Sequence, residues 1–157
     1  MPSKPMIDRA RRGAFDDICT PAHAVEYLLP CIPEGVIWES AYGTGALASA
    51  LSGRAVVWGA RDYFSWEPPE WDVQVTNPPF SLKAKWLRRA NELGKPWALL
   101  LPVTALGSRA CQEQLAGCEV LFLPRRVEFT GKKAPWFAVA WFTRGFELAY
   151  PLSFIAA

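Results

Sequence analysis

Metal-binding and disulfide-forming residues are scarce in this 157-residue chain. It contains one His, and its four cysteines (Cys19, Cys31, Cys111 and Cys118) include no Cys-x-x-Cys pair. Structural zinc sites draw several such ligands from short spacings, and disulfide-stapled domains need a framework of paired cysteines. We therefore expect neither a metal enzyme nor a disulfide scaffold.

Long apolar runs are also missing. The longest uninterrupted stretches, 97–103 and 134–142, fall well short of the roughly 18 residues that a membrane-spanning helix requires. The basic residues near the N-terminus are not followed by an apolar run, which disfavours a secretory signal. We expect a protein that does not cross a membrane and that works in the cytoplasm.

Charged residues are few, at 20% of the chain, whereas hydrophobic types reach 51% and aromatic types 13%. This balance favours a folded core over disorder, and the length suits one domain. We expect a flexible N-terminal arm over residues 1–15 and a single domain over residues 16–157.

The charge is unevenly distributed, although the whole chain carries a net charge of only +2. Residues 34–80 hold two Lys or Arg against six Asp or Glu, and residues 81–157 hold 11 against five. An acidic first part suits a cationic small molecule, and a basic second part suits a polyanion. Solvated charges on helix faces would produce the same pattern.

Short apolar runs alternate with helical patterns up to about residue 123. Strands are expected at 36–38, 55–58, 71–76, 97–101 and 119–123, and helices at 23–29, 46–51, 82–93 and about 106–115. Thr20 is expected to be the N-cap of the first helix, with Pro21 at its first position. The alternation predicts an α/β fold with a mostly parallel, doubly wound sheet.

The last part of the chain has a different pattern. Val127, Phe129 and the run 136–142 are typical of β-segments with no helix between them, separated by a turn at 131–133. We therefore expect antiparallel strands at the C-terminal end of the sheet.

A glycine turn, Gly43-Thr44-Gly45, lies between the expected strand at 36–38 and the following helix. Such glycines let the backbone approach a ligand closely. With Ala48, and Asp62 further on, the segment also satisfies the dinucleotide pattern, so a nicotinamide cofactor stays possible at this point. Glu39 favours a cationic ligand over a pyrophosphate, and a purely structural turn is a further alternative.

A second motif, Asn77-Pro78-Pro79-Phe80, ends the strand at 71–76, because proline cannot continue a strand. The Asn77 amide oxygen and the Pro78 carbonyl could both accept hydrogen bonds from one NH₂ group, while the Phe80 ring stacks on the flat group that carries it. Such bonds keep the nitrogen lone pair available to attack a methyl donor, without a dedicated general base. An ordinary turn with a buried Phe is the alternative.

These motifs, in this order, resemble those of amino-group S-adenosylmethionine-dependent DNA methyltransferases, and the chain is similar to the small phage-type DNA N6-adenine methyltransferases. The resemblance covers about residues 14–145. Its other points are Asp-Asp-x-x-Thr-Pro at 16–21, Trp-Asp-Val-x-Val-Thr at 71–76, Leu-Leu-Leu-Pro at 99–102, Phe-Leu-Pro-Arg-Arg at 122–126 and Phe-Thr-Gly-Lys at 129–132. It implies a Rossmann-like methyltransferase fold, host cytoplasm if a phage encodes the chain, and methyl transfer to adenine N6 in DNA.

The resemblance also implies residue roles. The catalytic element would be Asn77, Pro78, Pro79 and Phe80, and S-adenosylmethionine would be held by Thr20, Pro21, Glu39, Ala41, Gly43, Gly45, Asp62 and Asn77. Basic residues that could contact DNA phosphates are Lys83, Lys85, Arg88, Arg125, Arg126, Lys132 and Lys133. No metal and no membrane are implied as partners.

The chain departs from the family between its second strand and Asn77. Relatives have separate acids for the cofactor's ribose and for its adenine, whereas only Asp62 lies between Trp58 and Trp66. This connection is therefore shortened. A catalytically inactive relative that binds nucleic acid, or a methyltransferase acting on amines or amides of RNA or protein, are the alternatives.

Overall fold

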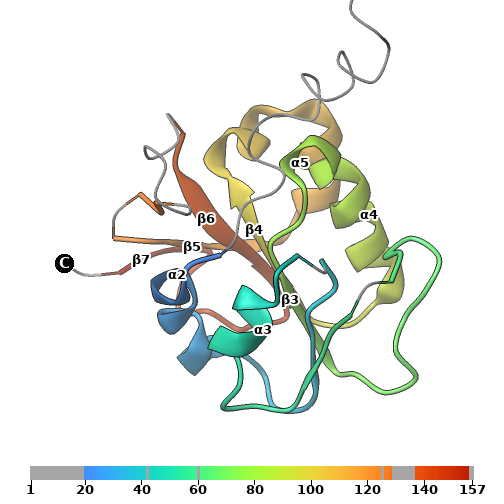
Figure 1. The fold of residues 1–157 in the computed structure, drawn as a ribbon. Helices are drawn as coiled ribbons and strands as arrows, with labels where there is room; N and C mark the ends of the chain where they lie inside the picture. Colours follow the sequence, from blue (N-terminus) through green and yellow to red (C-terminus); the bar gives the residue numbers. More distant parts are fainter. Residues whose placement is uncertain (1–19, 42, 60, 125, 129–136, 156–157) are drawn as a thin grey trace, which may run out of the picture.

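In the computed structural model, the described residues are 20–41, 43–59, 61–124, 126–128 and 137–155, and Figure 1 shows their arrangement. The expected N-terminal arm, the turn at 131–133, Phe129, Arg125, Lys132 and Lys133 lie outside them.

The described strands form one seven-stranded sheet with the order β2-β1-β3-β4-β6-β5-β7. Strands β1 to β4 pair in parallel, β6 is antiparallel to both β4 and β5, and β7 pairs in parallel with β5. The strand bounds are β1 Ile37–Trp38, β2 Val56–Val57, β3 Val73–Thr76, β4 Trp97–Pro102, β5 Glu119–Phe122, β6 Val139–Arg144 and β7 Leu152–Phe154. The predicted fold class, a mostly parallel sheet with antiparallel C-terminal pairing, is confirmed.

Helices cover both faces of this sheet (Figure 1). The α-helices are α2 Ala22–Glu26, α3 Ala46–Ala50, α4 Lys83–Leu93 and α5 Arg109–Leu115, and the 3₁₀ turns are η1 Leu29–Cys31, η2 Phe80–Leu82 and η3 Val103–Gly107. One core cluster packs α2 and α3 on the sheet, and the other packs α4 and α5 on the opposite face. Along β4 the buried side chains alternate between the two clusters, which explains why this strand is apolar throughout.

Three details differ from the prediction. Pro21, not Thr20, is the N-cap of α2, and the helix has no side-chain capping bond. Proline with an extended ψ of 147° takes the position that the threonine was expected to fill. Val127 is buried but lies outside any strand. Strand β7 was not predicted, because three residues are too few to show an alternating pattern.

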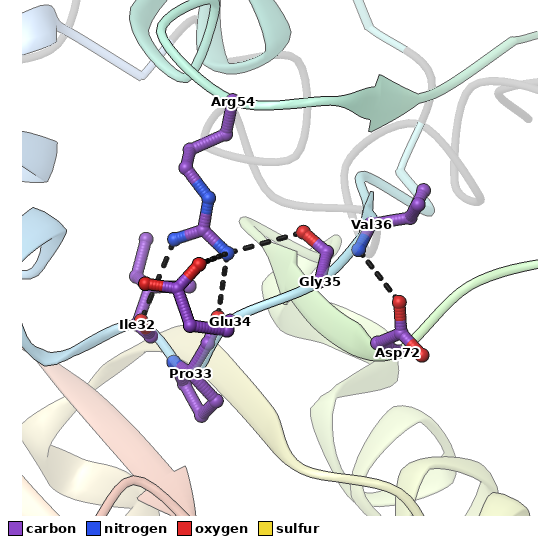
Figure 2. Close-up of polar contacts among 7 residues, drawn as sticks. All are labelled: Ile32, Pro33, Glu34, Gly35, Val36, Arg54 and Asp72. Atoms are coloured by element: carbon purple, nitrogen blue, oxygen red, sulfur yellow. Dashed lines mark hydrogen bonds and ion pairs between the residues drawn. The ribbon is translucent and has the colours of Figure 1, made fainter.

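Polar contacts stabilise the segment that leads into β1, at the end of the strand away from Glu39 (Figure 2). The Arg54 guanidinium donates to the backbone carbonyls of Ile32 (3.5 Å), Pro33 (2.6 Å) and Gly35 (3.1 Å). The Asp72 carboxylate accepts a hydrogen bond from the backbone N–H of Val36 at 2.7 Å. These contacts hold the chain that enters β1 against the segments that lead into β2 and β3.

Aromatic side chains stabilise the connection between β2 and β3, in whose described residues there is no helix or strand. Tyr63 stacks on Trp86 of α4 with ring centroids 3.8 Å apart, and Trp38 packs against Tyr63, Trp66 and Trp71 at 5.0 to 6.2 Å. This packing holds in place the connection that the sequence predicted to be shortened. No helix in the described part of the chain is long and apolar enough to span a membrane.

Candidate active site

The order in which strands are added to the sheet reverses at β1. After β1 the chain adds β2 on one side, and it then returns to add β3 on the other side. In doubly wound sheets, ligands bind at such a switch point, beyond the carboxyl ends of the strands. Glu39 directly follows β1 and Asn77 directly follows β3, so both lie at this point.

A cavity of about 580 Å³ is present there. This volume lies in the range of roughly 300–1,000 Å³ that is typical of small-molecule sites. Its lining residues are Thr20, Glu39, Ser40, Ala41, Gly43, Thr44, Gly45, Ala46, Leu47, Arg61, Asp62, Tyr63, Phe64, Asn77, Pro79, Leu82 and Trp86. One cavity therefore joins the glycine turn to the Asn-Pro-Pro segment.

The glycine turn has the backbone that its residues predict. Gly43 has a φ of +55° and Gly45 a φ of +80°, both in the left-handed region, and Gly45 is the N-cap of α3. A Cβ on Gly45 would lie 3.1 Å from the Trp58 ring. A side chain at this position would therefore be strained and crowded, whereas glycine leaves the backbone close to the cavity.

Glu39 is a buried carboxylate in the cavity wall, with 2% of its surface exposed. Its Oε1 accepts hydrogen bonds from the Thr76 hydroxyl at 2.6 Å and from the backbone N–H of Ala41 at 2.9 Å. Burial raises the pKa of Glu39 to about 7, although both hydrogen bonds act to lower it. A cationic ligand would stabilise the ionised form, whereas a pyrophosphate would be repelled by it.

Asn77 is held by a residue far away in the sequence. Its side-chain Nδ2 donates a hydrogen bond to the Thr20 hydroxyl at 2.9 Å. Its Oδ1 is shielded from solvent, and among the described residues it has no hydrogen-bond partner. A buried acceptor without a partner is costly and rare, so a ligand N–H is the kind of group that this site lacks.

The rest of the motif is placed differently. Pro79 lines the cavity, and its carbonyl accepts from the Leu82 N–H at 3.0 Å. Pro78 is buried, and neither it nor Phe80 is among the lining residues. Phe80 is 8% exposed, and its ring packs edge-on against Phe137 with centroids 5.9 Å apart. Stacking of Phe80 on a substrate stays a prediction, and it would require the ring to turn out of this packing.

Among the expected cofactor residues, Thr20, Glu39, Ala41, Gly43, Gly45, Asp62 and Asn77 line the cavity. Pro21 does not, and it serves as the start of α2. The Asp62 carboxylate accepts from the Phe64 N–H at 3.3 Å and from the Ser65 hydroxyl at 2.7 Å, so it also holds its own turn.

Sequence reasoning gave no role to four contributors: Ser40, Gln74, Thr76 and Trp86. Thr76 bonds Glu39, and it could have been found as the last residue of the strand before Asn77. Tyr63 donates to the Gln74 side chain at 3.2 Å, and Gln74 donates to Ser40 at 2.7 Å. These two buried hydrogen bonds, the Tyr63–Gln74–Ser40 relay, link the β2–β3 connection to the end of β1. No local sequence pattern predicts them.

The basic residues divide into two groups. Lys85 and Arg88 are exposed on α4 and Arg126 is exposed after β5, whereas Lys83 is half-buried and donates to the Phe80 carbonyl at 3.4 Å. The neighbouring Arg89 forms an ion pair with Glu67 at 3.7 Å. In the described part of the chain, no group of three or more His, Cys, Asp and Glu side chains is placed to hold a metal ion.

No known family model matches the chain, and neither does any curated protein. Solved structures do resemble it. A protein described as a modification subunit of a type I restriction enzyme from Vibrio vulnificus has a TM-score of 0.56 at 15% identity, covering 89% of this chain and 47% of that one. The chain thus spans about half of that subunit.

Two further structures are less similar. One is described as an RNA methyltransferase from Pyrococcus horikoshii, with a TM-score of 0.47 at 16% identity over 78% of this chain and 77% of that one. The other is a dimethyladenosine transferase from Plasmodium falciparum, with a TM-score of 0.44 at 14% identity over 78% and 59%. The sheet order and the Vibrio structure together show a Rossmann-like methyltransferase fold.

Proposed function

We propose that this chain is an S-adenosylmethionine-dependent methyltransferase that modifies the N6 amino group of adenine in DNA. The observation that carries the proposal is the state of the Asn77 amide: Oδ1 is buried without a partner, at the end of β3, in a side chain that lines the cavity.

The substrate side of the proposal follows from hydrogen-bond chemistry. An exocyclic NH₂ group offers two donors, and a free amide oxygen accepts one of them. We assign the second to the Pro78 carbonyl. Holding both protons in this way draws the nitrogen lone pair out of conjugation with the ring, which makes the nitrogen a better nucleophile. The methylated nitrogen then releases one proton to solvent, so the reaction needs no charged base beside the amine.

The cofactor side fits the residues present. Glu39 offers a carboxylate to a cation, the glycine turn allows close approach, and Tyr63, Phe64 and Trp86 give the cavity an aromatic wall. We assign to Asp62 the adenine or ribose contact, because it is the acid after β2 that lines the cavity. When bound, S-adenosylmethionine supplies an electrophilic methyl group on a cationic sulfur.

The choice of DNA rests on two supports. The Vibrio structure is described as the modification subunit of a restriction enzyme. In addition, α4 follows the Asn-Pro-Pro segment after the turn η2, and it carries exposed Lys85 and Arg88, which can contact phosphates. Adenine N6 lies inside the base stack of a duplex, so the nucleotide must be extruded, at a cost of a few kcal/mol.

The experiment that tests this proposal follows the methyl group. The protein is incubated with S-adenosylmethionine tritiated in the methyl group and with duplex DNA, single-stranded DNA, RNA or a protein extract. We expect label in N6-methyladenine after digestion of DNA, and a loss of about 100-fold or more in Asn77→Ala. Label confined to RNA or protein would overturn the DNA assignment, and no transfer to any acceptor would overturn the proposal itself.

A further inference from the structure

We infer that Leu82 is a substrate-contacting residue, whose side chain packs against the face of the target base at the opening of the cavity. The sequence gives this role to Phe80, and it gives none to Leu82. The inference rests on the proposed function and adds a residue that contacts the base by its face, whereas Asn77 contacts the base by its amino group.

Leu82 belongs both to the cavity wall and to the surface. Among the large apolar side chains of the described residues that are more than a third exposed, Leu82 (37%) and Phe64 (42%) line the cavity. A wall residue that solvent also reaches lies where the cavity opens, so a group that enters the cavity passes it. Apolar atoms in such a place gain free energy when a ligand covers them.

The position of Leu82 in the chain distinguishes it from Phe64. Phe64 lies in the β2–β3 connection beside Asp62, which we assign to the cofactor. Leu82 ends the turn η2, which follows the Asn-Pro-Pro segment, and its backbone N–H donates to the Pro79 carbonyl at 3.0 Å. The exposed Lys85 follows on α4, about one helical turn away. Leu82 therefore connects the segment that would hold the amine to the helix that would contact phosphates.

Phe80 would have to leave the core to make the same contact. It belongs to the buried cluster that packs α2 and α3 on the sheet, its ring lies edge-on against Phe137, and it does not line the cavity. Turning the ring toward a base would leave a hole in that cluster, which is unfavourable. Leu82 needs no such rearrangement, since it is already part of the wall.

The chemistry of an extruded base favours an apolar neighbour of this kind. The hydrogen bonds assigned to Asn77 and Pro78 engage the amino group at the edge of the adenine ring, and they leave the flat faces of the ring uncovered. Those faces lose their stacking partners when the nucleotide leaves the duplex, and enzymes that extrude bases cover them with apolar or aromatic side chains. Leu82 thus offsets part of the cost of extrusion.

The first test detects the contact without turnover. In protein with ¹³C-labelled leucine methyl groups, the Leu82 signals are identified by their loss in Leu82→Met. S-adenosylhomocysteine is added first, and then a DNA fragment that the wild type methylates. A base that packs on a methyl group shifts the methyl proton signal upfield through its ring current. We expect this shift for Leu82 on addition of DNA, and none for Leu29, which is 38% exposed in the 3₁₀ turn η1 and does not line the cavity.

The order of addition separates the two ligands, because S-adenosylhomocysteine carries an adenine ring of its own. An upfield shift of Leu82 with S-adenosylhomocysteine alone would make Leu82 a cofactor contact and overturn the inference. DNA that shifts other signals of the protein but leaves Leu82 unmoved would also overturn it, while the proposed function would stand.

The second test measures methyl transfer to DNA. We expect Leu82→Ala to lower kcat/KM for DNA by about tenfold and Leu82→Met to keep most of it, with the Kd of S-adenosylhomocysteine unchanged in both. Leu29→Ala is the matched control and should leave kcat/KM unchanged. Phe80→Leu should lower the free energy of unfolding more than Leu82→Ala does, because Phe80 is a core residue.

Two kinetic results would contradict the inference. One is a Leu82→Ala variant with the kcat/KM of the wild type. The other is a Phe80→Leu variant that is as stable as the wild type but loses more of kcat/KM than Leu82→Ala, because the base would then stack on Phe80. A wild type that transfers no methyl group to DNA would instead overturn the proposed function, and the inference with it.

Discussion

At the scale of single residues, the cavity contains two groups that folding leaves in unfavourable states. Glu39 is a carboxyl group with a pKa raised to about 7 by burial, and Asn77 carries a shielded oxygen without a partner in the described chain. Each state becomes favourable when a ligand of the right chemistry arrives: a cation beside Glu39, an N–H beside Asn77. The protein therefore gives up stability at positions that a ligand would satisfy.

Glu39 leads to a prediction about the pH dependence of stability. Its pKa in the folded chain, about 7, lies above the unfolded value of 4.5, so between these values the unfolded state binds fewer protons. The free energy of unfolding should thus fall as pH rises from about 4.5 to 7. Glu39→Gln should match the wild type near pH 4.5 and exceed it by on the order of 2–3 kcal/mol at pH 8.

Urea unfolding at both pH values measures this difference. Glu70→Gln is the matched control, because Glu70 is exposed on the surface, and its substitution should change the free energy of unfolding by less than about 0.5 kcal/mol. A Glu39→Gln variant that is no more stable than the wild type at pH 8 would contradict the buried, destabilising carboxylate.

At the scale of elements, the close contact between Gly35 and Asp72, at the end of the sheet away from the cavity, contributes to stability. Gly35 has a φ of +118°, and a Cβ on it would overlap the Asp72 carboxylate, which accepts a hydrogen bond from the Val36 N–H just before β1. Both the backbone strain and the overlap oppose any side chain there. Gly35→Ala should therefore lower the free energy of unfolding by about 2–4 kcal/mol.

Thermal and urea unfolding check this value. Gly53→Ala is the control, because its added Cβ would meet no atom within 4 Å, and it should change the stability by less than about 0.5 kcal/mol. Comparable destabilisation by both substitutions would show that Asp72 is not the obstacle.

The elements also show which features a sequence pattern can predict. Strand β4 and helix α4 were predicted almost to their bounds, because a run buried on both faces and a 3.6-residue period are local signals. The prediction that Thr20 is the N-cap of α2 was wrong, since a proline can occupy this position as well as a threonine. Strand β7 was missed because its pairing with β5, not its own residues, makes it a strand.

At the scale of the whole molecule, the site could be predicted in part. The glycine turn and the Asn-Pro-Pro segment each end a strand, so a parallel sheet brings them to one edge. The partners that tune them could not be read in advance. Thr20 lies 57 positions from Asn77, and the Tyr63–Gln74–Ser40 relay links three segments, so these contacts exist only once the chain has folded.

The uneven charge of the whole chain yields the last prediction. Lys85 and Arg88 are exposed on α4, directly after the segment that would hold the target base, and each phosphate contact releases counterions. The logarithm of DNA affinity should fall steeply with the logarithm of salt concentration, and Lys85→Ala or Arg88→Ala should each reduce that slope by about 1. Fluorescence anisotropy of a labelled duplex, titrated at several NaCl concentrations, measures the slope. Arg109→Ala is the matched control, because its side chain is 96% exposed on α5, where no contact with DNA is proposed. If Arg109→Ala reduces the slope as much as Arg88→Ala does, DNA is attracted by the overall charge of the protein and is not bound along α4.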